Sequence, residues 1–311
     1  MISPMMFAMV LAAAPMERPL TAPGPQAPLA GTLLDAGKGT PVVLIIPGSG
    51  PTDRDGNNPL GVTAAPYRLL AEALGQRGIS SVRIDKRGMF GSKAAIPDAN
   101  KVSIADYAAD AHAWVASIRK TAGAKCVWLL GHSEGALVAL AAAQRPEGIC
   151  GVISVAGMGR RFGAVMREQF RANPANAPIL DAALGAIDTL EAGKTVDGGS
   201  LPAPLQSLFN PAVQPFVRDL MAQDPPKLAA SLKVPLLIVQ GDQDLQVTVQ
   251  NARVLAAAHP QAKLAIVPGV NHVLKVPGGG DGRAQNFAAY ADPSLPVAPA
   301  VVDAVAGFVK S

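Results

Sequence analysis

Short apolar runs alternate with stretches of helical periodicity along most of the chain, starting near residue 40. Continuous apolar runs have the length of buried strands, whereas apolar residues three and four apart indicate amphipathic helices. The strand-like runs are residues 42–46, 80–84, 127–130, 152–156, 234–240 and 263–267. The helix-like stretches are residues 67–77, 103–121, 136–144 and 248–258. This alternation predicts an α/β fold with a mostly parallel central sheet and helices on both faces.

The alternation stops between residues 157 and 226, where the sequence shows no clear strand. Helical patterns at 160–171 and 179–192 occupy this stretch together with several prolines. We therefore divide the chain into a core, residues 29–156 and 227–311, and an inserted helical cap, residues 157–226. An insertion at this place can shape the substrate pocket or act as a lid.

The run Gly131-His132-Ser133-Glu134-Gly135 lies between a predicted strand and a predicted helix. A G-x-S-x-G sequence in that setting is typical of the nucleophile elbow of α/β-hydrolases, which exposes the serine at its apex. The sharp turn leaves room only for residues without Cβ on either side. The pattern predicts Ser133 as the nucleophile and Gly131 and Gly135 as the elbow glycines. The alternative is a glycine-flanked serine in an ordinary loop, which the flanking strand and helix disfavour.

A serine hydroxyl needs a base at neutral pH, normally a histidine oriented by an acid. In this fold the order along the chain is serine, acid, histidine, which leaves His259 and His272 as candidates. His259 ends a predicted helix, an ordinary place for a histidine, whereas His272 follows the strand 263–267 in a short loop. We expect His272 to be the base. We expect His112 to be solvated or partly packed, and His132 to be structural.

The acid is expected after the strand 234–240, where Gly241-Asp242-Gln243-Asp244 follows. Both aspartates are candidates. The G-x-x-D spacing, followed by an apolar residue and a new helix, resembles the acid site of many α/β-hydrolases and favours Asp244. Asp242 is then expected to be a turn residue that bonds to its own backbone.

Two backbone N–H groups should stabilise the oxyanion that forms when a serine attacks a carbonyl. One is expected from Glu134, the residue after the nucleophile. The other is expected from the glycine-rich loop after strand 42–46, where the backbone can approach a ligand closely. We predict the N–H of Ser49 for this role, with that of Gly50 as the alternative.

Two charged loops, Asp53-Arg54-Asp55 and Asp85-Lys86-Arg87, lie near the expected pocket. Their side chains could clamp a polar substrate. Side chains that brace loops against each other or against the cap are the commoner arrangement, and we expect that role for them.

Several motifs together resemble a family of bacterial α/β-hydrolases with a loop of sequence GSGPTDRDGN, found here at residues 48–57. The resemblance runs from about Leu29 to Val309. It implies the triad Ser133, Asp244 and His272 and hydrolysis of small, mostly short-acyl esters, and similar proteins often carry export signals. The segment before Leu29 looks short, so the usual N-terminal hairpin is expected to be trimmed. The other matching pieces are Asp85-Lys86-Arg87-Gly88, the elbow, Asn271-His272-Val273-Leu274-Lys275 and Tyr290-Ala291-Asp292-Pro293.

These features predict a serine esterase, a carboxylesterase that cleaves small carboxylic esters through an acyl-enzyme on Ser133. The first alternative is a serine aminopeptidase-like hydrolase of small peptides or amides. That activity would need carboxylates to hold the substrate ammonium, such as Glu168 or Glu191 of the cap. A non-catalytic binding protein on a hydrolase scaffold is a remote alternative, because all three triad residue types are present.

Composition and charge narrow the partners. Of the 311 residues, 49% are hydrophobic and 16% are charged, which suits a large core. The net charge is only +4 and no basic run is interleaved with aromatic residues, so nucleic acid is not an expected partner. We expect a small-molecule ester substrate, no cofactor, no metal and no stable membrane insertion. The oligomeric state stays open.

The N-terminal segment and the two cysteines bear on the compartment. Residues 5–14 form an apolar run too short to span a bilayer and ending in small residues, so residues 1–16 resemble a secretory signal peptide. Residues 17–28 follow as a Pro-rich segment. Export would make the protein periplasmic or secreted; otherwise it is cytoplasmic. Cys126 and Cys150 begin neighbouring predicted strands, which suits either a disulfide or two buried thiols.

Overall fold

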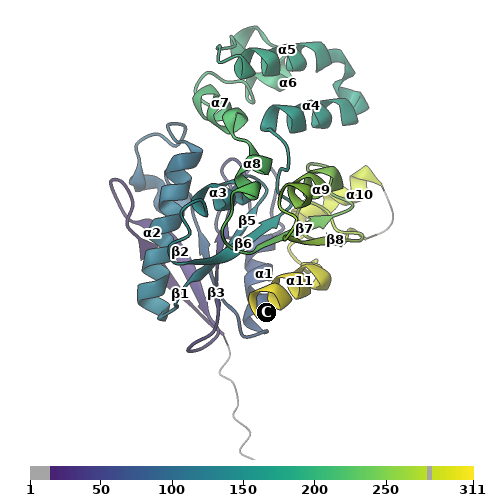
Figure 1. The fold of residues 1–311 in the computed structure, drawn as a ribbon. Helices are drawn as coiled ribbons and strands as arrows, with labels where there is room; N and C mark the ends of the chain where they lie inside the picture. Colours follow the sequence, from purple (N-terminus) through teal and green to yellow (C-terminus); the bar gives the residue numbers. More distant parts are fainter. Residues whose placement is uncertain (1–14, 279–281) are drawn as a thin grey trace, which may run out of the picture.

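A mostly parallel sheet runs through the centre of the molecule, which the computed structural model describes over residues 15–278 and 282–311 (Figure 1). The strands are β1 (Met16–Ala22), β2 (Leu29–Asp35), β3 (Val42–Ile46), β4 (Ser80–Ile84), β5 (Val127–His132), β6 (Ile149–Val155), β7 (Leu236–Gly241) and β8 (Lys263–Val267). Their order is β1-β2-β4-β3-β5-β6-β7-β8. Strands β3 to β8 are parallel, and β2 pairs antiparallel with both β4 and the edge strand β1. The predicted fold class is confirmed, and β3, β4 and β8 have the predicted bounds.

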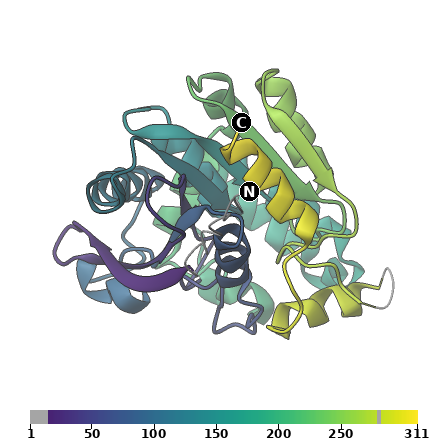
Figure 2. The same cartoon turned by 90° about the horizontal axis from the view of Figure 1, so that it is seen from below.

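Helices cover both faces of the sheet, as predicted. Helices α2, α3, α8 and α9 pack on one face, and α1 and α11 pack side by side on the other (Figure 2). Two covering layers are needed because the strands of a parallel sheet are apolar on both sides. The helices of the core are α1 (Pro66–Gly75), α2 (Ile104–Ala122), α3 (Glu134–Ala142), α8 (Pro225–Ala230), α9 (Val249–Ala258), α10 (Arg283–Ala288) and α11 (Pro299–Val309).

The N-terminal segment forms a hairpin, because β1 pairs with β2 along its whole length. Most of β1 is exposed, but Leu20 is buried, and Glu17 forms an ion pair with the buried Arg83 of β4. The expectation of a trimmed hairpin is therefore wrong. The strand contains Pro19 and lies at the sheet edge, where a missing N–H donor is tolerated. Residues 1–14, most of the candidate signal peptide, lie outside the described residues.

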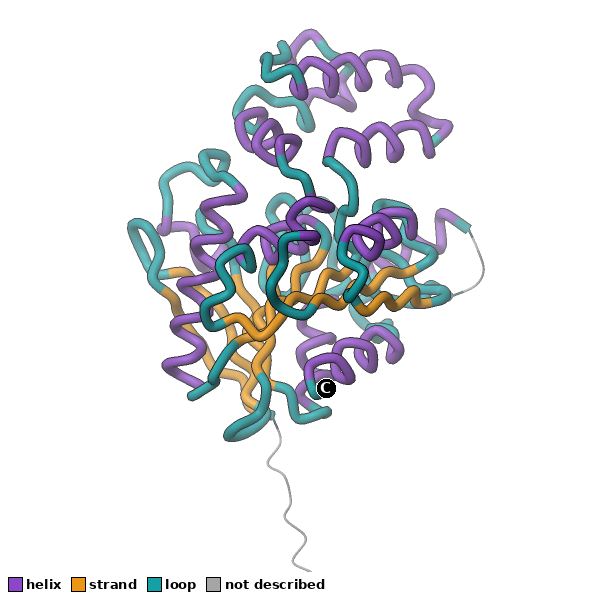
Figure 3. Tube along the Cα trace, viewed as in Figure 1, coloured by secondary structure: helices purple, strands orange, loops and turns teal. Residues whose placement is uncertain are grey.

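The insertion between β6 and β7 is helical and stands apart from the sheet as a separate layer (Figure 1 and Figure 3). Its main helices are α4 (Phe162–Ala172), α5 (Leu180–Glu191), α6 (Ala203–Gln206) and α7 (Gln214–Ala222). The insertion has a small apolar core of its own, which includes the buried side chains of Ile187, Phe209 and Met221. Between residues 157 and 226 the structure contains no strand, in agreement with the sequence pattern.

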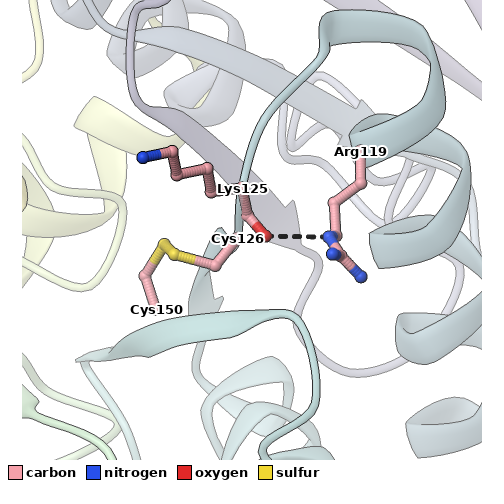
Figure 4. Close-up of a disulfide and its surroundings, with 4 residues drawn as sticks. All are labelled: Arg119, Lys125, Cys126 and Cys150. Carbon is pink, nitrogen blue, oxygen red and sulfur yellow. Dashed lines mark hydrogen bonds between the residues drawn. A yellow bond between two sulfur atoms is a disulfide. The ribbon is translucent and has the colours of Figure 1, made fainter.

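Cys126 and Cys150 form a disulfide at the starts of β5 and β6 (Figure 4). Their Cα atoms are 5.2 Å apart. Beside the bond, Nε of Arg119 donates a hydrogen bond of 2.9 Å to the carbonyl oxygen of Lys125. Of the two states that the sequence left open, the structure has the bonded one. The disulfide lies at the end of β5 opposite to the end that Ser133 follows.

Candidate active site

Ser133 occupies the sharp turn between β5 and α3. Its backbone angles, φ 54° and ψ −118°, lie in a region that non-glycine residues rarely adopt and that stores strain. A Cβ atom added to Gly131 would lie 2.0 Å from the carbonyl oxygen of Gly135, and one added to Gly135 would lie 2.3 Å from that of Ile46. Neither glycine position can therefore hold a side chain. At Gly131 the turn itself fills the space, and at Gly135 strand β3 fills it.

His272 and Asp244 meet at the carboxyl ends of β8 and β7. Nδ1 of His272 lies 2.7 Å from Oδ2 of Asp244, and Oδ1 accepts hydrogen bonds of 2.8 Å from the N–H groups of Gln246 and Val247. Burial alone would raise the pKa of Asp244, but the charge and hydrogen bond of His272 and the two N–H groups keep it below its ordinary value. An ionised carboxylate accepts a hydrogen bond from the N–H of Nδ1, so in the neutral ring Nε2 of His272 is left as an acceptor.

Asp242, two residues earlier, is exposed and lies outside this pair. Its Oδ1 accepts a hydrogen bond of 2.7 Å from the N–H of Gly269, in the turn after β8. We predicted that Asp242 bonds to its own backbone, and this is wrong. Its carboxylate accepts from the turn after β8 and so joins two neighbouring turns.

Ser133 and His272 line one cavity of about 160 Å³. Among the described residues, the Ser133 hydroxyl makes no hydrogen bond with the imidazole; such contacts are often long without a substrate and shorten when one binds. The cavity thus exposes a hydroxyl and a carboxylate-bound imidazole to the same space. Further polar side chains in its wall are Thr52, Asn58, Tyr67, His132, Gln246 and Tyr290.

A second histidine, His132, is buried beside the first, with ring centroids 4.7 Å apart. Its Nε2 lies 2.8 Å from the carbonyl oxygen of His272, and its Nδ1 lies 2.8 Å from the hydroxyl of Tyr67. Burial and the neighbouring His272 lower the pKa of His132 to about 3, so the ring is neutral. A carbonyl can only accept, so Nε2 carries the proton and Nδ1 accepts from Tyr67.

Tyr67 extends this network to the loop after β3, since its hydroxyl accepts a hydrogen bond of 3.0 Å from the N–H of Gly48. One chain of hydrogen bonds therefore joins the glycine loop, the elbow strand and the loop of His272. No motif in the sequence points to Tyr67. Its position on the first turn of α1, with a buried face, is also that of an ordinary core tyrosine.

The other two histidines, His112 and His259, do not line the cavity. Nε2 of His112 lies 3.0 Å from the carbonyl oxygen of Ala142 at the end of α3, which agrees with the expected partly packed role. Burial lowers the pKa of His112. His259 follows the last residue of α9, as expected.

The loop after β3 closely approaches the elbow. A Cβ atom on Gly48 would lie 3.3 Å from Cβ of Ser133. Among the described residues, the N–H groups of Ser49, Gly50 and Glu134 have no acceptor. Unbonded N–H groups in a glycine loop and at a helix start can bind a negative oxygen. Ser49 lines the cavity that holds Ser133, and Gly50 does not.

The charged loops mostly brace the core. The N–H of Arg54 donates a hydrogen bond of 2.9 Å to Asp85, and the two side chains form an ion pair. Arg87 donates a hydrogen bond of 2.7 Å to Asp110 of α2. These contacts agree with the bracing role that we expected. Lys86 differs, because its buried ammonium is directed at the glycine loop and the elbow helix.

A second and larger cavity of about 390 Å³ shares Ser49 with the first. This volume lies within the range of small-molecule sites. Leu60 and Leu208 in its wall are 85% and 39% exposed, so the apolar lining continues to the surface. Core loops and cap together supply its apolar side chains, which include Met89, Val102, Phe162, Phe216, Val217 and Leu220.

Within residues 15–278 and 282–311, no three His, Cys, Asp or Glu side chains are grouped so that they could hold a metal ion. None of the helices in the described ranges is both long and apolar enough to cross a lipid bilayer.

Comparison with known proteins agrees with the fold. A family model described as the alpha/beta hydrolase family matches residues 42–278. Esterase EstD of Thermotoga maritima is 26% identical over 241 residues, which cover 75% of this chain and 54% of that protein. The chain therefore spans about half the length of this relative.

Solved structures share the fold at low sequence identity. Alpha/beta hydrolase GrgF from Penicillium sp. sh18 has a TM-score of 0.59 and 20% identity, covering 83% of this chain and 91% of that one. Est1E from Butyrivibrio proteoclasticus has a TM-score of 0.56 and 19% identity, covering 94% of this chain and 97% of that one. Because the family model also matches well over half of the sequence, the chain belongs to the alpha/beta hydrolase family.

Proposed function

We propose that the protein is a serine hydrolase of small carboxylic esters, with Ser133 as nucleophile, His272 as base and Asp244 as the acid that orients it. One observation carries the proposal: a serine in a strained elbow shares a cavity with an imidazole bound to a buried carboxylate. The esterase name of the Thermotoga relative supports an ester as the bond that is cleaved.

The proposed reaction is acyl transfer to water. Oγ of Ser133 attacks the ester carbonyl as Nε2 of His272 takes its proton, and the N–H groups of Ser49 and Glu134 stabilise the oxyanion. His272 then gives this proton to the leaving alcohol, and an acyl-enzyme remains. Water then attacks the acyl carbon, and His272 takes a proton from this water. The proton passes to Oγ of Ser133 when the bond between Oγ and the acyl carbon breaks and the acid leaves. Asp244 keeps the Nδ1 proton in place throughout.

The two cavities suggest where the alcohol and the acyl group of the substrate bind. The leaving alcohol must lie near Nε2 of His272, and His272 lines the smaller, more polar cavity but not the larger one. The acyl group then extends past Ser49 and Glu134 into the apolar cavity, which both residues line. We infer that the substrates combine an apolar acyl group with a small or polar alcohol. This extends the short-acyl expectation toward longer chains.

Replacement of Ser133 tests the nucleophile. In Ser133→Ala, kcat for p-nitrophenyl butyrate should fall by roughly 10⁴- to 10⁶-fold, because the hydroxyl forms the covalent bond. A fluorophosphonate probe should label the wild type at Ser133 and leave this variant unlabelled. Ser200→Ala, which changes an exposed cap serine, should keep both activity and label. Unchanged turnover in Ser133→Ala, or a wild type that takes no label, would reject the proposal.

A series of p-nitrophenyl esters from acetate to decanoate tests the acyl cavity. Each methylene buried there contributes about 0.8 kcal/mol, so kcat/KM should rise by up to about fourfold per carbon until the cavity is full. Val217→Trp, which places a large side chain in the cavity wall, should move the optimum to shorter chains. A steady fall in kcat/KM from acetate onward would contradict the acyl assignment.

An aminopeptidase-like activity would need a free carboxylate beside the acyl group. Glu168 forms an ion pair with Arg160 and accepts a hydrogen bond of 3.1 Å from Thr248, and Glu191 accepts one of 2.7 Å from Arg167. Neither carboxylate lines either cavity. We therefore favour the esterase, and expect p-nitrophenyl esters to be cleaved faster than amino-acyl p-nitroanilides.

We also propose that the protein works in an oxidising compartment outside the cytoplasm. The disulfide between Cys126 and Cys150 and the apolar run at residues 5–14 support this location. Titration of the unfolded protein without reductant should find no free thiol. Two free thiols would contradict the proposal.

A further inference from the structure

Lys86 follows β4, and its buried ammonium has three neighbours. Nζ donates a hydrogen bond of 2.7 Å to the carbonyl oxygen of Gly48 and one of 3.2 Å to Oε1 of Glu134. It also lies 5.3 Å from the centre of the Tyr107 ring. Lys86 and Glu134 are 5% and 1% exposed, so the ion pair is shielded from water. Its two hydrogen bonds lead to the two segments that carry the proposed oxyanion donors.

The bond to Gly48 acts on Ser49 through the peptide unit that joins them. The C=O of Gly48 and the N–H of Ser49 lie in one plane and, in a trans peptide, point in opposite directions. An ammonium on the oxygen therefore directs the N–H away from Lys86. Of the two cavities that Ser49 lines, Lys86 is in the wall of the larger one and not in that of the cavity of Ser133. The positive charge also polarises the peptide and strengthens the N–H as a donor.

Gly48 is held from its other side by Tyr67, whose hydroxyl accepts a hydrogen bond of 3.0 Å from its N–H. Both backbone polar groups of Gly48 are therefore bound to buried side chains. Ser49 and Gly50, which follow, are exposed. Lys86 is thus the side chain that fixes the peptide carrying the Ser49 donor, close to the nucleophile.

We propose that Lys86 is a positioning residue of the oxyanion hole. Its ammonium orients the peptide between Gly48 and Ser49 and, through the side chain of Glu134, the first turn of α3, so that both N–H groups converge on the oxyanion. This inference rests on the proposed ester hydrolysis. The competing role for Lys86 is that of a counter-ion for the buried Glu134 and nothing more.

A pair of variants that differ only at position 86 separates the two roles. Lys86→Met alone leaves Glu134 as an unpaired buried charge, and that variant can fail to fold. The double variant Lys86→Met with Glu134→Gln has a neutral pair, so it is compared with Glu134→Gln. Active sites are counted with a fluorophosphonate probe after prolonged incubation. We would then measure kcat and KM for p-nitrophenyl butyrate per labelled site, and the inhibition constant of phenylboronic acid, which forms a tetrahedral adduct with an active serine.

The double variant should have a kcat about 10- to 100-fold below that of Glu134→Gln, somewhat less than the loss of a whole oxyanion donor. KM should stay within about twofold, because the donor acts on the transition state, and phenylboronic acid should bind more weakly by a factor similar to that in kcat/KM. Equal kcat and equal inhibition constants in the two variants would overturn the proposal and leave Lys86 a counter-ion, with ester hydrolysis intact. A wild type that neither cleaves esters nor is labelled at Ser133 would reject the proposed function and this inference with it.

Discussion

The site contains two buried histidines, His272 and His132, whose rings are 4.7 Å apart but whose surroundings differ. Nδ1 of His272 faces the carboxylate of Asp244, whereas Nδ1 of His132 faces the hydroxyl of Tyr67. The negative charge of a carboxylate stabilises an imidazolium, and a neutral hydroxyl supplies no such charge. Without a carboxylate partner, burial and the neighbouring His272 lower the pKa of His132 to about 3. The comparison teaches that the partner of Nδ1, rather than burial, distinguishes a histidine that can exchange protons from one that braces the structure.

The largest expected difference comes from the same substitution made at both positions. In His272→Gln, kcat for p-nitrophenyl butyrate should fall by about 10⁴- to 10⁶-fold, because no base remains. In His132→Gln the loss should be only roughly tenfold, since small misplacements of the catalytic groups are its sole effect. Steady-state kinetics of the two variants measure both losses. If His132→Gln were as inactive as His272→Gln, the distinction between the two histidines would be wrong.

Replacing the carboxylate behind His272 should have the next largest effect. In Asp244→Asn, kcat should fall by roughly 10³- to 10⁴-fold, because the amide no longer holds the proton on Nδ1. The control is Asp242→Asn, which keeps an oxygen acceptor for the N–H of Gly269 and should change kcat by less than about threefold. Equal losses of kcat in the two variants would show that the carboxylate of Asp244 is not what gives His272 its role.

The neutral state of His132 predicts a pH dependence of stability. Its pKa is about 3 in the folded protein and about 6.5 in the unfolded chain. As pH falls below about 6.5 only the unfolded chain takes up this proton, so the free energy of unfolding decreases by up to about 1.4 kcal/mol per pH unit until about pH 3. Between pH 7 and pH 5 this loss should reach about 2 kcal/mol, and His132→Gln should lack it. Urea unfolding of the wild type and of His132→Gln at pH 7 and pH 5 measures the difference. Equal losses of unfolding free energy in the two proteins would show that His132 is protonated when folded.

The smallest effect is expected from the partner of His132. Tyr67→Phe removes the hydroxyl from both His132 and the N–H of Gly48. Unfolding should become easier by about 1 kcal/mol. Because Gly48 also loses one of its two anchors, kcat should fall a few-fold while KM holds. Thermal unfolding and ester kinetics test both parts, and a loss of kcat as large as that in Asp244→Asn would break the distinction between the two networks.

Sequence patterns were sufficient for the parallel strands β3 to β8 and insufficient at the edge that β1 forms. Strand β3 is a continuous apolar run whose five residues are all buried, so its bounds could be read directly. Strand β1 is mostly exposed, contains Pro19 and follows no alternating pattern, so the sequence indicated only a Pro-rich segment there and no strand. An edge strand is formed by pairing with its neighbour, and that neighbour is not visible in a local window of sequence.

The same limit applies to the site. A local motif points to Ser133, and a loop after a predicted strand points to His272. The roles of Tyr67 and Lys86 depend on contacts with residues 65 and 38 positions away, which no local pattern records. The loop containing Lys86 was noted for its charge, and bracing was the expected role, because the sequence could not tell that this ammonium turns inward.

The Cys126–Cys150 disulfide gives the active site an unusual covalent connectivity. Ser133 lies inside the closed segment, and the proposed acid and base follow it along the chain. A protease that cuts the exposed turn at Glu147 would place the nucleophile on one polypeptide and its partners on another. The nicked protein would remain a single covalent molecule, and a reductant would remove the only covalent link between the two parts of its site.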